Sequence, residues 1–305
     1  MRTLKTSEAA ALLNVSPNTL RAWERRFGYP KPQRSVGKHR LYTHGEIAAL
    51  RDALHEGLSI SSAVSVAREA LASETHSLVG ALSSLELDRA DGAMEAALAL
   101  RSLERAVEEV LLPSLTEVRG RQGAESAPWA LASRWGNEWL RRAQRLAPPP
   151  TRPLTLLIGD ATDGELDGDY AAVRSLELFS ARAGARLMGL PVRGVSGLAE
   201  VISSVTPPPS AIVIAGTGAD DDSVARWAYA ARAAAGPLPI SLFRRGGRAD
   251  RMRSRGISVL SDKPSAAQSE LFATVFQLPT TPLPADPMPV PRPMSRFATR
   301  REAAV

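Results

Sequence analysis

A run of three prolines, Pro148-Pro149-Pro150, divides this chain of 305 residues into two parts that must fold differently. Proline lacks a backbone N–H and clashes with the preceding helical turn, so neither a helix nor a central strand crosses the run. Before it, residues 73–147 are rich in Ala, Leu, Glu and Arg, and their apolar residues recur with the helical period. We therefore expect a four-helix bundle over residues 73–150.

After the proline run, short apolar runs alternate with segments of helical pattern. Near-continuous apolar strands separated by helices are typical of a doubly wound parallel sheet, which we expect to be an α/β domain of the flavodoxin-like type over residues 151–278. The tail, residues 279–305, is rich in proline, and we expect it to be disordered. The strands are expected at 154–158, 186–190, 211–215, 238–243 and 256–260, and the helices at 170–183, 197–205 and 222–235.

The first 72 residues have a third pattern, in which short helices follow one another with turns between them. Ser16 and Pro17 are a good N-cap and a good first helical residue. In the helix predicted over residues 18–26, Leu20 and Trp23 share one face, which can pack on a neighbouring helix. This arrangement is typical of a helix-turn-helix.

A basic stretch from Pro30 to Tyr42 follows. Two extended arms around Gly37 predict a hairpin, and its cations suit a phosphate backbone. After the hairpin, Thr43 caps a helix that runs to His55, and a further helix is expected from Ser59 to Ala67.

Positive charge is concentrated at the N-terminus. The chain has a formal net charge of +6, and residues 1–58 hold ten Lys or Arg against five Asp or Glu, a balance of +5. Cations on a helix-turn-helix indicate contact with the phosphates of double-stranded DNA. The alternative is a solvated, charged surface on a small helical domain.

The segment Thr19-Leu20-Arg21-Ala22-Trp23-Glu24-Arg25-Arg26, followed by Gly37-Lys38-His39-Arg40-Leu41-Tyr42, resembles the DNA-binding domain of MerR-family transcription regulators. The resemblance covers nearly all of residues 3–70 and implies a mainly α winged helix-turn-helix domain over residues 1–72. It also implies that the protein bends and twists promoter DNA. The DNA-binding residues that it implies are Asn18, Thr19, Arg21 and Arg25 in the major groove, and Arg34, Lys38, His39, Arg40 and Tyr42 on the wing.

In architecture, residues 73–265 resemble the helical cap and sheet domain of the MerR regulators that sense light through adenosylcobalamin, the CarH/LitR group. The residues that bind cobalamin in that group are absent: Asp167 stands where the resemblance expects the histidine that ligates cobalt, and Tyr170 stands where it expects glycine. The last of the four histidines is His76, so the sheet domain has no imidazole to offer. A carboxylate is a hard ligand and a poor substitute. We therefore expect that cobalamin is not the ligand and that no metal is bound, we assign no cofactor, and we keep an unknown small-molecule effector as an alternative.

A different ligand can bind at the carboxyl ends of the parallel strands, where open α/β sheets bind theirs. Three tryptophans on one predicted helix form either an aromatic pocket wall or, as aromatic stripes more commonly do, part of the core. Acids in the loop of residues 160–169 are either solvated turn groups or a cation site. The expected ligand-binding residues are Trp129, Trp135, Trp139, Tyr170, Gly216 and Arg244.

These patterns together predict a sequence-specific transcription regulator and not an enzyme, because no nucleophile–base arrangement follows residue 77. We expect a homodimer or homotetramer that binds a promoter operator near RNA polymerase. Its C-terminal parts either sense a small-molecule effector or serve in oligomerisation. The alternatives are a light-responsive regulator that holds cobalamin without a protein imidazole, a DNA-bound scaffold for a protein partner, and a corrinoid-dependent enzyme module.

The absence of cysteine excludes disulfides, thiolate metal sites and iron–sulfur clusters. No run of about 18 apolar residues occurs, so we expect no membrane span and a cytoplasmic location.

Overall fold

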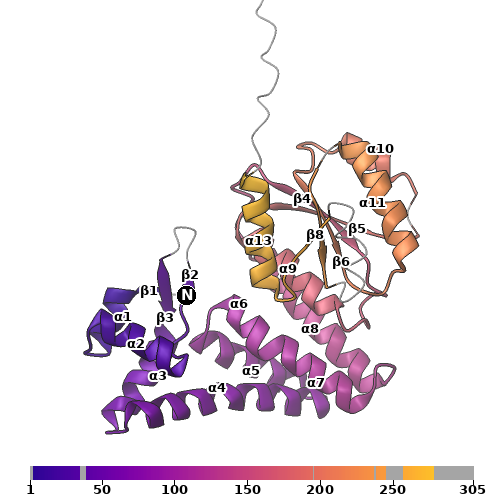
Figure 1. Ribbon diagram of the computed structural model, residues 1–305. Helices are drawn as coiled ribbons and strands as arrows, with labels where there is room; N and C mark the ends of the chain where they lie inside the picture. The colour runs from indigo at the N-terminus through magenta and orange to yellow at the C-terminus, as the bar shows by residue number, and fades with distance from the viewer. Residues whose placement is uncertain (1–2, 35–38, 195, 237, 245–256, 278–305) are drawn as a thin grey trace, which may run out of the picture.

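The computed structural model describes residues 3–34, 39–194, 196–236, 238–244 and 257–277 (Figure 1). It is rich in helices and has a parallel sheet of five strands in its C-terminal half. The tail of residues 279–305, which we expected to be disordered, lies outside the described residues. No helix in these ranges is both long and apolar enough to cross a membrane.

The N-terminal part combines three helices with a small antiparallel sheet in the order β1-β3-β2. Ser16 Oγ accepts a hydrogen bond from the Thr19 N–H at 3.0 Å and caps α2, and Gly28, at φ +63°, ends it. Leu20 is buried in the core of this part, as is Leu4 on β1, a strand that we did not predict. The elements are β1 (Thr3–Lys5), α1 (Thr6–Leu12), α2 (Pro17–Phe27), β2 (Gln33–Arg34), β3 (Arg40–Thr43) and α3 (His44–His55).

The next helix, α4 (Ile60–Ser83), is longer than expected. We predicted a helix end at Ala67 and a domain boundary after residue 72, but α4 continues past both, because the segment contains no proline to stop it. Val64, in its first half, packs in the N-terminal core, and Leu78, in its second half, packs in the core that follows. One helix therefore belongs to both parts.

The second half of α4 packs with the helices α5 to α8, and we call this group the helical bundle. Its core is apolar and includes Met94, Leu111 and Leu140. Within it, α6, η1 and α7 form one continuous helix. Pro113, which has no N–H to donate to an earlier carbonyl, accounts for the π-helical turn η1. The elements are α5 (Leu87–Leu100), α6 (Leu103–Ala106), η1 (Val107–Leu111), α7 (Leu112–Gln122) and α8 (Ala127–Arg145).

The five described strands of the C-terminal sheet are all parallel and lie in the order β5-β4-β6-β7-β8. The helices α10 and α11 cover one face, and α9 and α13 cover the other (Figure 1). All five strands were predicted to within a few residues, whereas α13 was not predicted. The elements are β4 (Thr155–Asp160), α9 (Tyr170–Arg182), β5 (Arg186–Pro191), α10 (Leu198–Ser204), β6 (Ala211–Ala215), α11 (Asp221–Ala235), β7 (Ile240–Phe243), β8 (Ser258–Val259) and α13 (Pro264–Gln277).

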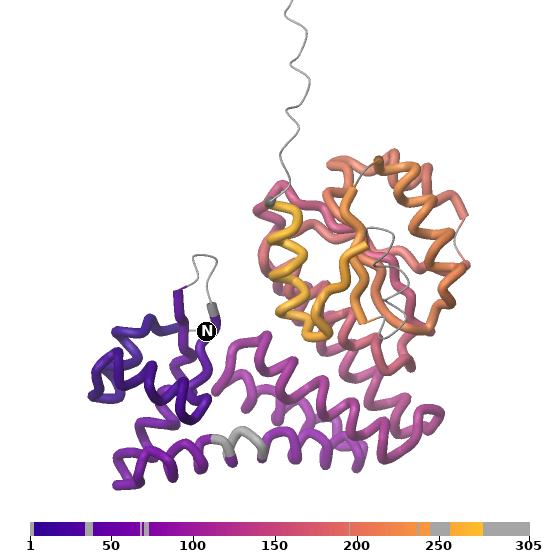
Figure 2. Tube along the Cα trace, in the orientation of Figure 1, coloured from indigo at the N-terminus to yellow at the C-terminus, as the bar shows by residue number. Residues whose placement is uncertain are grey.

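The bundle contacts both of the other parts. Figure 2 shows it running beneath the sheet domain and meeting the N-terminal part at one end. The helix α8 packs along α9 of the sheet domain, and α3 packs on α4 and α5. The bundle is thus the element through which the two outer parts are placed relative to each other.

Candidate nucleic-acid interface

Helix α2 presents one exposed polar face. Asn18, Arg21 and Arg25 are exposed and lie three and four residues apart, so they share this face, while Leu20 is buried. Arg21 Nη1 donates to Asn18 Oδ1 at 3.1 Å. Thr19 is half-buried, and its hydroxyl lies 2.8 Å from that of the N-cap Ser16. Amide and guanidinium groups on this face can bind base edges.

The hairpin strand β3 is connected to α2 through Glu24. This carboxylate accepts hydrogen bonds from Arg40 Nε at 3.0 Å and from the Tyr42 hydroxyl. Tyr42 is fully buried, and burial, followed by the bond to Glu24, raises the pKa of its hydroxyl above the usual range. We expected Tyr42 to face DNA phosphates, but its ring fills the core and supports the hairpin from inside. Glu24 was not predicted, because its partners lie in another segment.

A hollow of about 650 Å³ opens between α1, α2 and β3. It brings Arg21 of α2 next to His39 and Arg40 of the hairpin, and it adds Lys5, which we did not predict. Cations from three segments therefore line one concave surface, which suits an anionic backbone. Of the other expected hairpin contacts, Lys38 lies outside the described residues, as does the side chain of Arg34.

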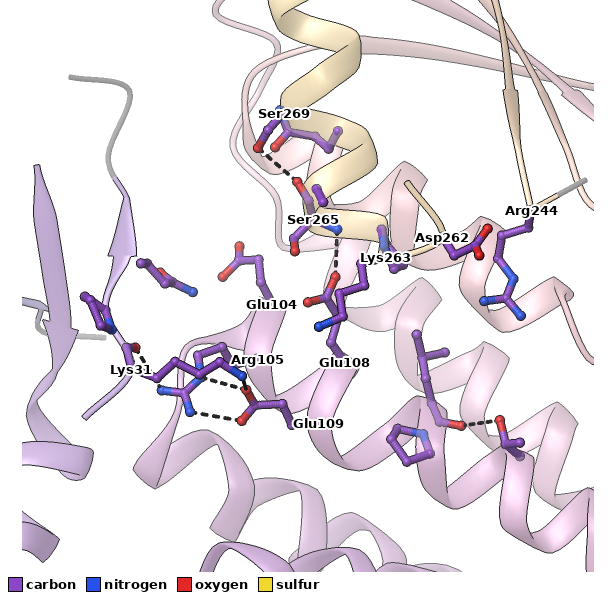
Figure 3. Close-up of a pocket in the computed structure, with 18 of the residues that line it drawn as sticks. Lys31, Glu104, Arg105, Glu108, Glu109, Arg244, Asp262, Lys263, Ser265 and Ser269 are labelled. Carbon is purple, nitrogen blue, oxygen red and sulfur yellow. Dashed lines mark hydrogen bonds and ion pairs between the residues drawn. The ribbon is translucent and has the colours of Figure 1, made fainter. Parts of the chain in front are cut away.

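At the base of the hairpin, a network of charged side chains joins the N-terminal part to the bundle (Figure 3). Arg105 Nη1 donates to Glu46 Oε2 at 2.8 Å, and Arg105 Nη2 donates to Glu109 Oε2 at 3.0 Å. Lys31 Nζ lies 3.3 Å from Glu109 Oε1. The Arg105–Glu46 and Lys31–Glu109 pairs were not predicted, because they join residues that are 59 and 78 positions apart in the sequence.

Burial opposes charge in this network, but the ion pairs preserve it on Arg105 and Glu109. Glu46 is almost inaccessible, and burial raises its pKa even against the attraction of Arg105. Burial also disfavours charge on Glu109, but the hydrogen bonds and charge of Arg105 outweigh it and lower the pKa. For Arg105, burial lowers the pKa, but the charges and hydrogen bonds of Glu46 and Glu109 raise it by more. The net pKa is raised, so the guanidinium stays charged. Loss of Arg105 leaves a buried carboxylate without its partner, which is costly.

At the carboxyl edge of the sheet, two of the six expected ligand-binding residues line one pocket. Trp129 of α8 and Arg244, which follows β7, border a space of about 500 Å³, together with Arg119 and Thr217. Arg244 also pairs with Asp169 at 2.7 Å. This pocket offers an aromatic ring and guanidinium groups to a small ligand.

The other four expected residues are engaged elsewhere. Trp135 is buried and donates to Asp91 Oδ1 at 3.0 Å, and Trp139 is half-buried against the bundle core, which favours the core interpretation of both. The ring of Tyr170 lies under the Arg174 guanidinium, 4.7 Å from the ring centroid. Gly216, at φ +101°, packs against Thr162, whose Cγ2 would lie 2.5 Å from an added Cβ. Within the described ranges, no three His, Cys, Asp or Glu side chains form a metal cluster.

A cobalamin does not fit the residues at this edge. Asp167, which stands where a cobalt ligand was expected, accepts the backbone N–H groups of Asp163 and Asp169, each at 2.9 Å, so both its oxygens are engaged. The same loop contacts the bundle directly, since Trp129 Nε1 donates to the Leu166 carbonyl at 3.1 Å. The pocket at this edge, of about 500 Å³, has the volume of pockets for drug-sized ligands, which span roughly 300–1,000 Å³. A corrin with its side chains is larger than such ligands.

Comparison with known proteins identifies relatives of the N-terminal part and of more than half of the chain. Residues 4–69 match the family described as MerR HTH family regulatory protein. The HTH-type transcriptional repressor CarA of Myxococcus xanthus is 33% identical over 183 residues, which cover 54% of this chain and 62% of that one. The HTH-type transcriptional repressor CarH of the same organism is 29% identical over 143 residues, 39% of this chain and 48% of that one.

A shorter match involves the HTH-type transcriptional regulator MlrA of Escherichia coli strain K12, 49% identical over 45 residues, 15% of this chain and 18% of that one. Each match spans less than two thirds of the relative's own length. All three relatives are named as transcription regulators or repressors, in agreement with our expectation that the chain is not an enzyme.

Proposed function

We propose that this chain, whose N-terminal part is a MerR-family helix-turn-helix domain, regulates transcription by binding double-stranded DNA at a promoter operator. The observation that carries the proposal is the exposed face of α2, with Asn18, Arg21 and Arg25, inside the segment that matches the family. A helix of this kind enters the major groove and places its side chains on base edges.

The residues of the head have separate roles in this proposal. Asn18, Arg21 and Arg25 bind bases, and Thr19 supports them from the helix start. Arg34, Lys38, His39 and Arg40 bind phosphates as the wing, and Tyr42 holds the wing on α2 through Glu24. Arginine and lysine on phosphates fix the register of the domain on the duplex, while the groove contacts select the sequence.

We interpret residues 1–72 as a winged helix-turn-helix domain, 73–150 as a four-helix bundle, 151–278 as a flavodoxin-like domain and 279–305 as a tail. The strand order β5-β4-β6-β7-β8 supports the flavodoxin-like assignment, because it is the order 2-1-3-4-5 of that fold. The first boundary falls inside α4, so the DNA-binding domain and the bundle share a helix.

For the C-terminal parts, we propose assembly of a homodimer or homotetramer and sensing of a small effector other than cobalamin at the pocket of Trp129 and Arg244. A symmetric dimer would place two DNA-binding domains on two half-sites, near RNA polymerase. The second candidate is a DNA-bound scaffold for a protein partner, and the engagement of the four other expected ligand residues favours it. Thermal shifts with panels of small anionic and aromatic compounds separate the two, since a scaffold shows none.

DNA binding is tested with duplexes that the wild-type protein selects from a random-sequence library, by fluorescence anisotropy. Arg25→Ala should weaken binding to the selected duplex by about tenfold or more, because one good base contact contributes about 1–3 kcal/mol. Lys38→Ala should weaken binding to all duplexes alike and reduce the slope of log K against log salt by about 1, as expected for one lost phosphate contact.

Arg89→Ala is the matched control, since Arg89 is an exposed bundle arginine paired with Glu86, far along the chain from the DNA-binding face. It should bind like the wild type. If the protein enriches no duplex, or if Arg25→Ala and Lys38→Ala bind as Arg89→Ala does, the proposed function is wrong.

A further inference from the structure

The helical segment of residues 104–109 has two faces that contact different parts of the molecule (Figure 3). Glu104 and Glu108, four residues apart, contact the sheet domain, while Arg105 and Glu109, also four apart, contact the N-terminal part. The segment runs through α6 into the π-helical turn η1. Such turns occur frequently at functional sites.

Arg105 and Glu109 bind the residue that leads into the hairpin. The Lys31 carbonyl accepts from Arg105 Nη1 at 3.3 Å, and the Lys31 N–H donates to Glu46 Oε1 at 2.8 Å. The Lys31 ammonium lies 3.3 Å from Glu109. Backbone and side chain of Lys31 are therefore both held, two residues before β2 begins.

The two strands of the hairpin meet the same end of the bundle at their bases. The Thr43 hydroxyl, at the end of β3, donates to the Leu100 carbonyl at 2.9 Å, and Gln33 Nε2, at the start of β2, donates to Ser102 Oγ. The hairpin thus rises from the junction of α5 and α6, and its direction depends on where that junction lies.

Two contacts join the sheet domain to the helical face that carries Glu104 and Glu108. One is a helix cap and the other is an ion pair. The Ser265 N–H, in the first turn of α13, donates to Glu108 Oε1 at 2.7 Å, so a bundle carboxylate occupies the N-terminus of a sheet-domain helix. Arg182 of α9 donates to Glu104 Oε1 at 3.2 Å. Between these contacts and Lys31 lies a cleft of about 890 Å³, bordered by all three parts.

We propose that Arg105 and Glu109 are positioning residues for the DNA-binding hairpin, and that Glu108 links this support to the sheet domain. The inference rests on the proposed function only in that the hairpin binds DNA. Buried ion pairs add little net stability compared with apolar packing, and fixing one geometry among several is a role that suits them. Movement of α13 relative to the bundle would reach the hairpin through adjacent residues of one helical turn.

The test measures the hairpin directly in the full-length protein. The chain has no cysteine, so spin labels can be placed with His39→Cys, beside β3, and Glu95→Cys, on the exposed side of α5. Double electron–electron resonance then gives the distribution of distances between the hairpin and the bundle. In the labelled parent we expect a narrow distribution. Glu109→Gln and Arg105→Lys should broaden it, since each removes part of the bidentate pairing.

Glu86→Gln is the matched control, because Glu86 is a bundle carboxylate in an exposed pair with Arg89, and it should leave the distribution narrow. Glu108 accepts its hydrogen bond from Ser265 of the sheet domain, and Glu108→Ala should also broaden the distribution. Circular dichroism identifies variants that are folded, and only these are compared. A narrow distribution in folded Glu109→Gln and Arg105→Lys overturns the positioning role, and one in Glu108→Ala overturns the link to the sheet domain.

A second readout uses DNA and unlabelled protein. Glu109→Gln should reduce the slope of log K against log salt by about 1 to 2, because the hairpin's phosphate contacts are lost while the groove contacts of α2 remain. An unchanged slope together with unchanged distances contradicts the inference while leaving DNA binding intact. Failure of the wild type to bind any duplex contradicts the proposed function but leaves the distance measurement valid.

Discussion

At the scale of single residues, the sheet domain contains a buried acid whose ionisation is unfavourable. Glu177 of α9 is buried, and Arg174 donates to it at 2.6 Å and to Asp160 at 2.7 Å. One guanidinium thus serves two carboxylates. Burial, opposed by Arg174 and assisted by Asp160, raises the pKa of Glu177 to about 7 from the ordinary value of 4.5.

This pKa predicts a dependence of stability on pH. Because the folded-state pKa of Glu177 is raised, the folded state binds the extra proton, and the stability that this contributes is present below about pH 4.5 and is lost as the pH rises through about 7. Glu177→Gln remains neutral throughout. The free energy of unfolding of the wild type should therefore fall by about 1–3 kcal/mol relative to that of Glu177→Gln between about pH 5 and about pH 8. Urea unfolding at both pH values measures this difference.

The control is Glu200→Gln on α10, where the carboxylate is exposed. Its stability relative to wild type should not change between the two pH values. If the free energy of unfolding of Glu177→Gln depends on pH as that of the wild type does, the pKa of Glu177 is not raised in the folded protein.

At the scale of elements, the N-terminus of α3 packs on the end of α5 at backbone distance. A Cβ added to Gly45 would lie 2.4 Å from the Ala99 carbonyl oxygen and 2.8 Å from Leu100 Cα. Real Cβ atoms do not approach backbone so closely, so glycine is required for the two helices to meet as they do. This contact lies beside the Thr43 hydrogen bond that holds the base of the hairpin.

Gly45→Ala should therefore destabilise the protein by about 1–3 kcal/mol, because the helices must separate to admit the methyl group. The control is Gly92→Ala in α5, where an added Cβ meets nothing within 4 Å. There the same substitution should stabilise the helix by about 0.5–1 kcal/mol. Thermal or urea unfolding measures both, and effects of equal sign would contradict the packing argument.

At the scale of the whole molecule, the bundle contacts the sheet domain through direct hydrogen bonds. Buried polar groups of α8 bind the carbonyls of the loop after β4: Ser133 and Asn137 donate to Glu165, and Trp129 donates to Leu166. The loop is thus held against α8 by hydrogen bonds, and it carries Asp167, whose oxygens already accept two backbone N–H groups. Three buried donors make this contact specific.

We accordingly expect full-length protein incubated with hydroxocobalamin and desalted to carry no visible corrin absorption, and its melting temperature to be unchanged. A cobalamin-binding regulator that has the cobalt-ligating histidine serves as positive control. Co-elution of corrin colour with this chain in stoichiometric amount would show that the loop can be displaced, and would reinstate the cobalamin alternative.

Local patterns in the sequence determined much of the architecture. The prolines at 148–150 separate helical from strand-and-helix patterns, and Ser16 with Pro17 start α2, because capping and proline geometry act within a few residues. The apolar runs predicted every described strand of the parallel sheet. The face of α2 with Arg21 and Arg25 also followed from helical spacing alone. By contrast, the pattern predicted an end of α4 that is not there, since nothing in the segment requires one.

Only the tertiary structure decided which side chains pair across segments. The side chain of Tyr42 points inward to Glu24, although it was expected on the DNA-binding wing, and Trp135 lies in the bundle core, one of the two positions that its helical spacing allowed. The contacts of Arg105 and Glu109 with Lys31 have no local signature, because a charged residue on a helix has the same pattern whether it faces water or another part of the chain. Its partner depends on how distant elements pack, and that packing places the support of the DNA-binding hairpin in the bundle.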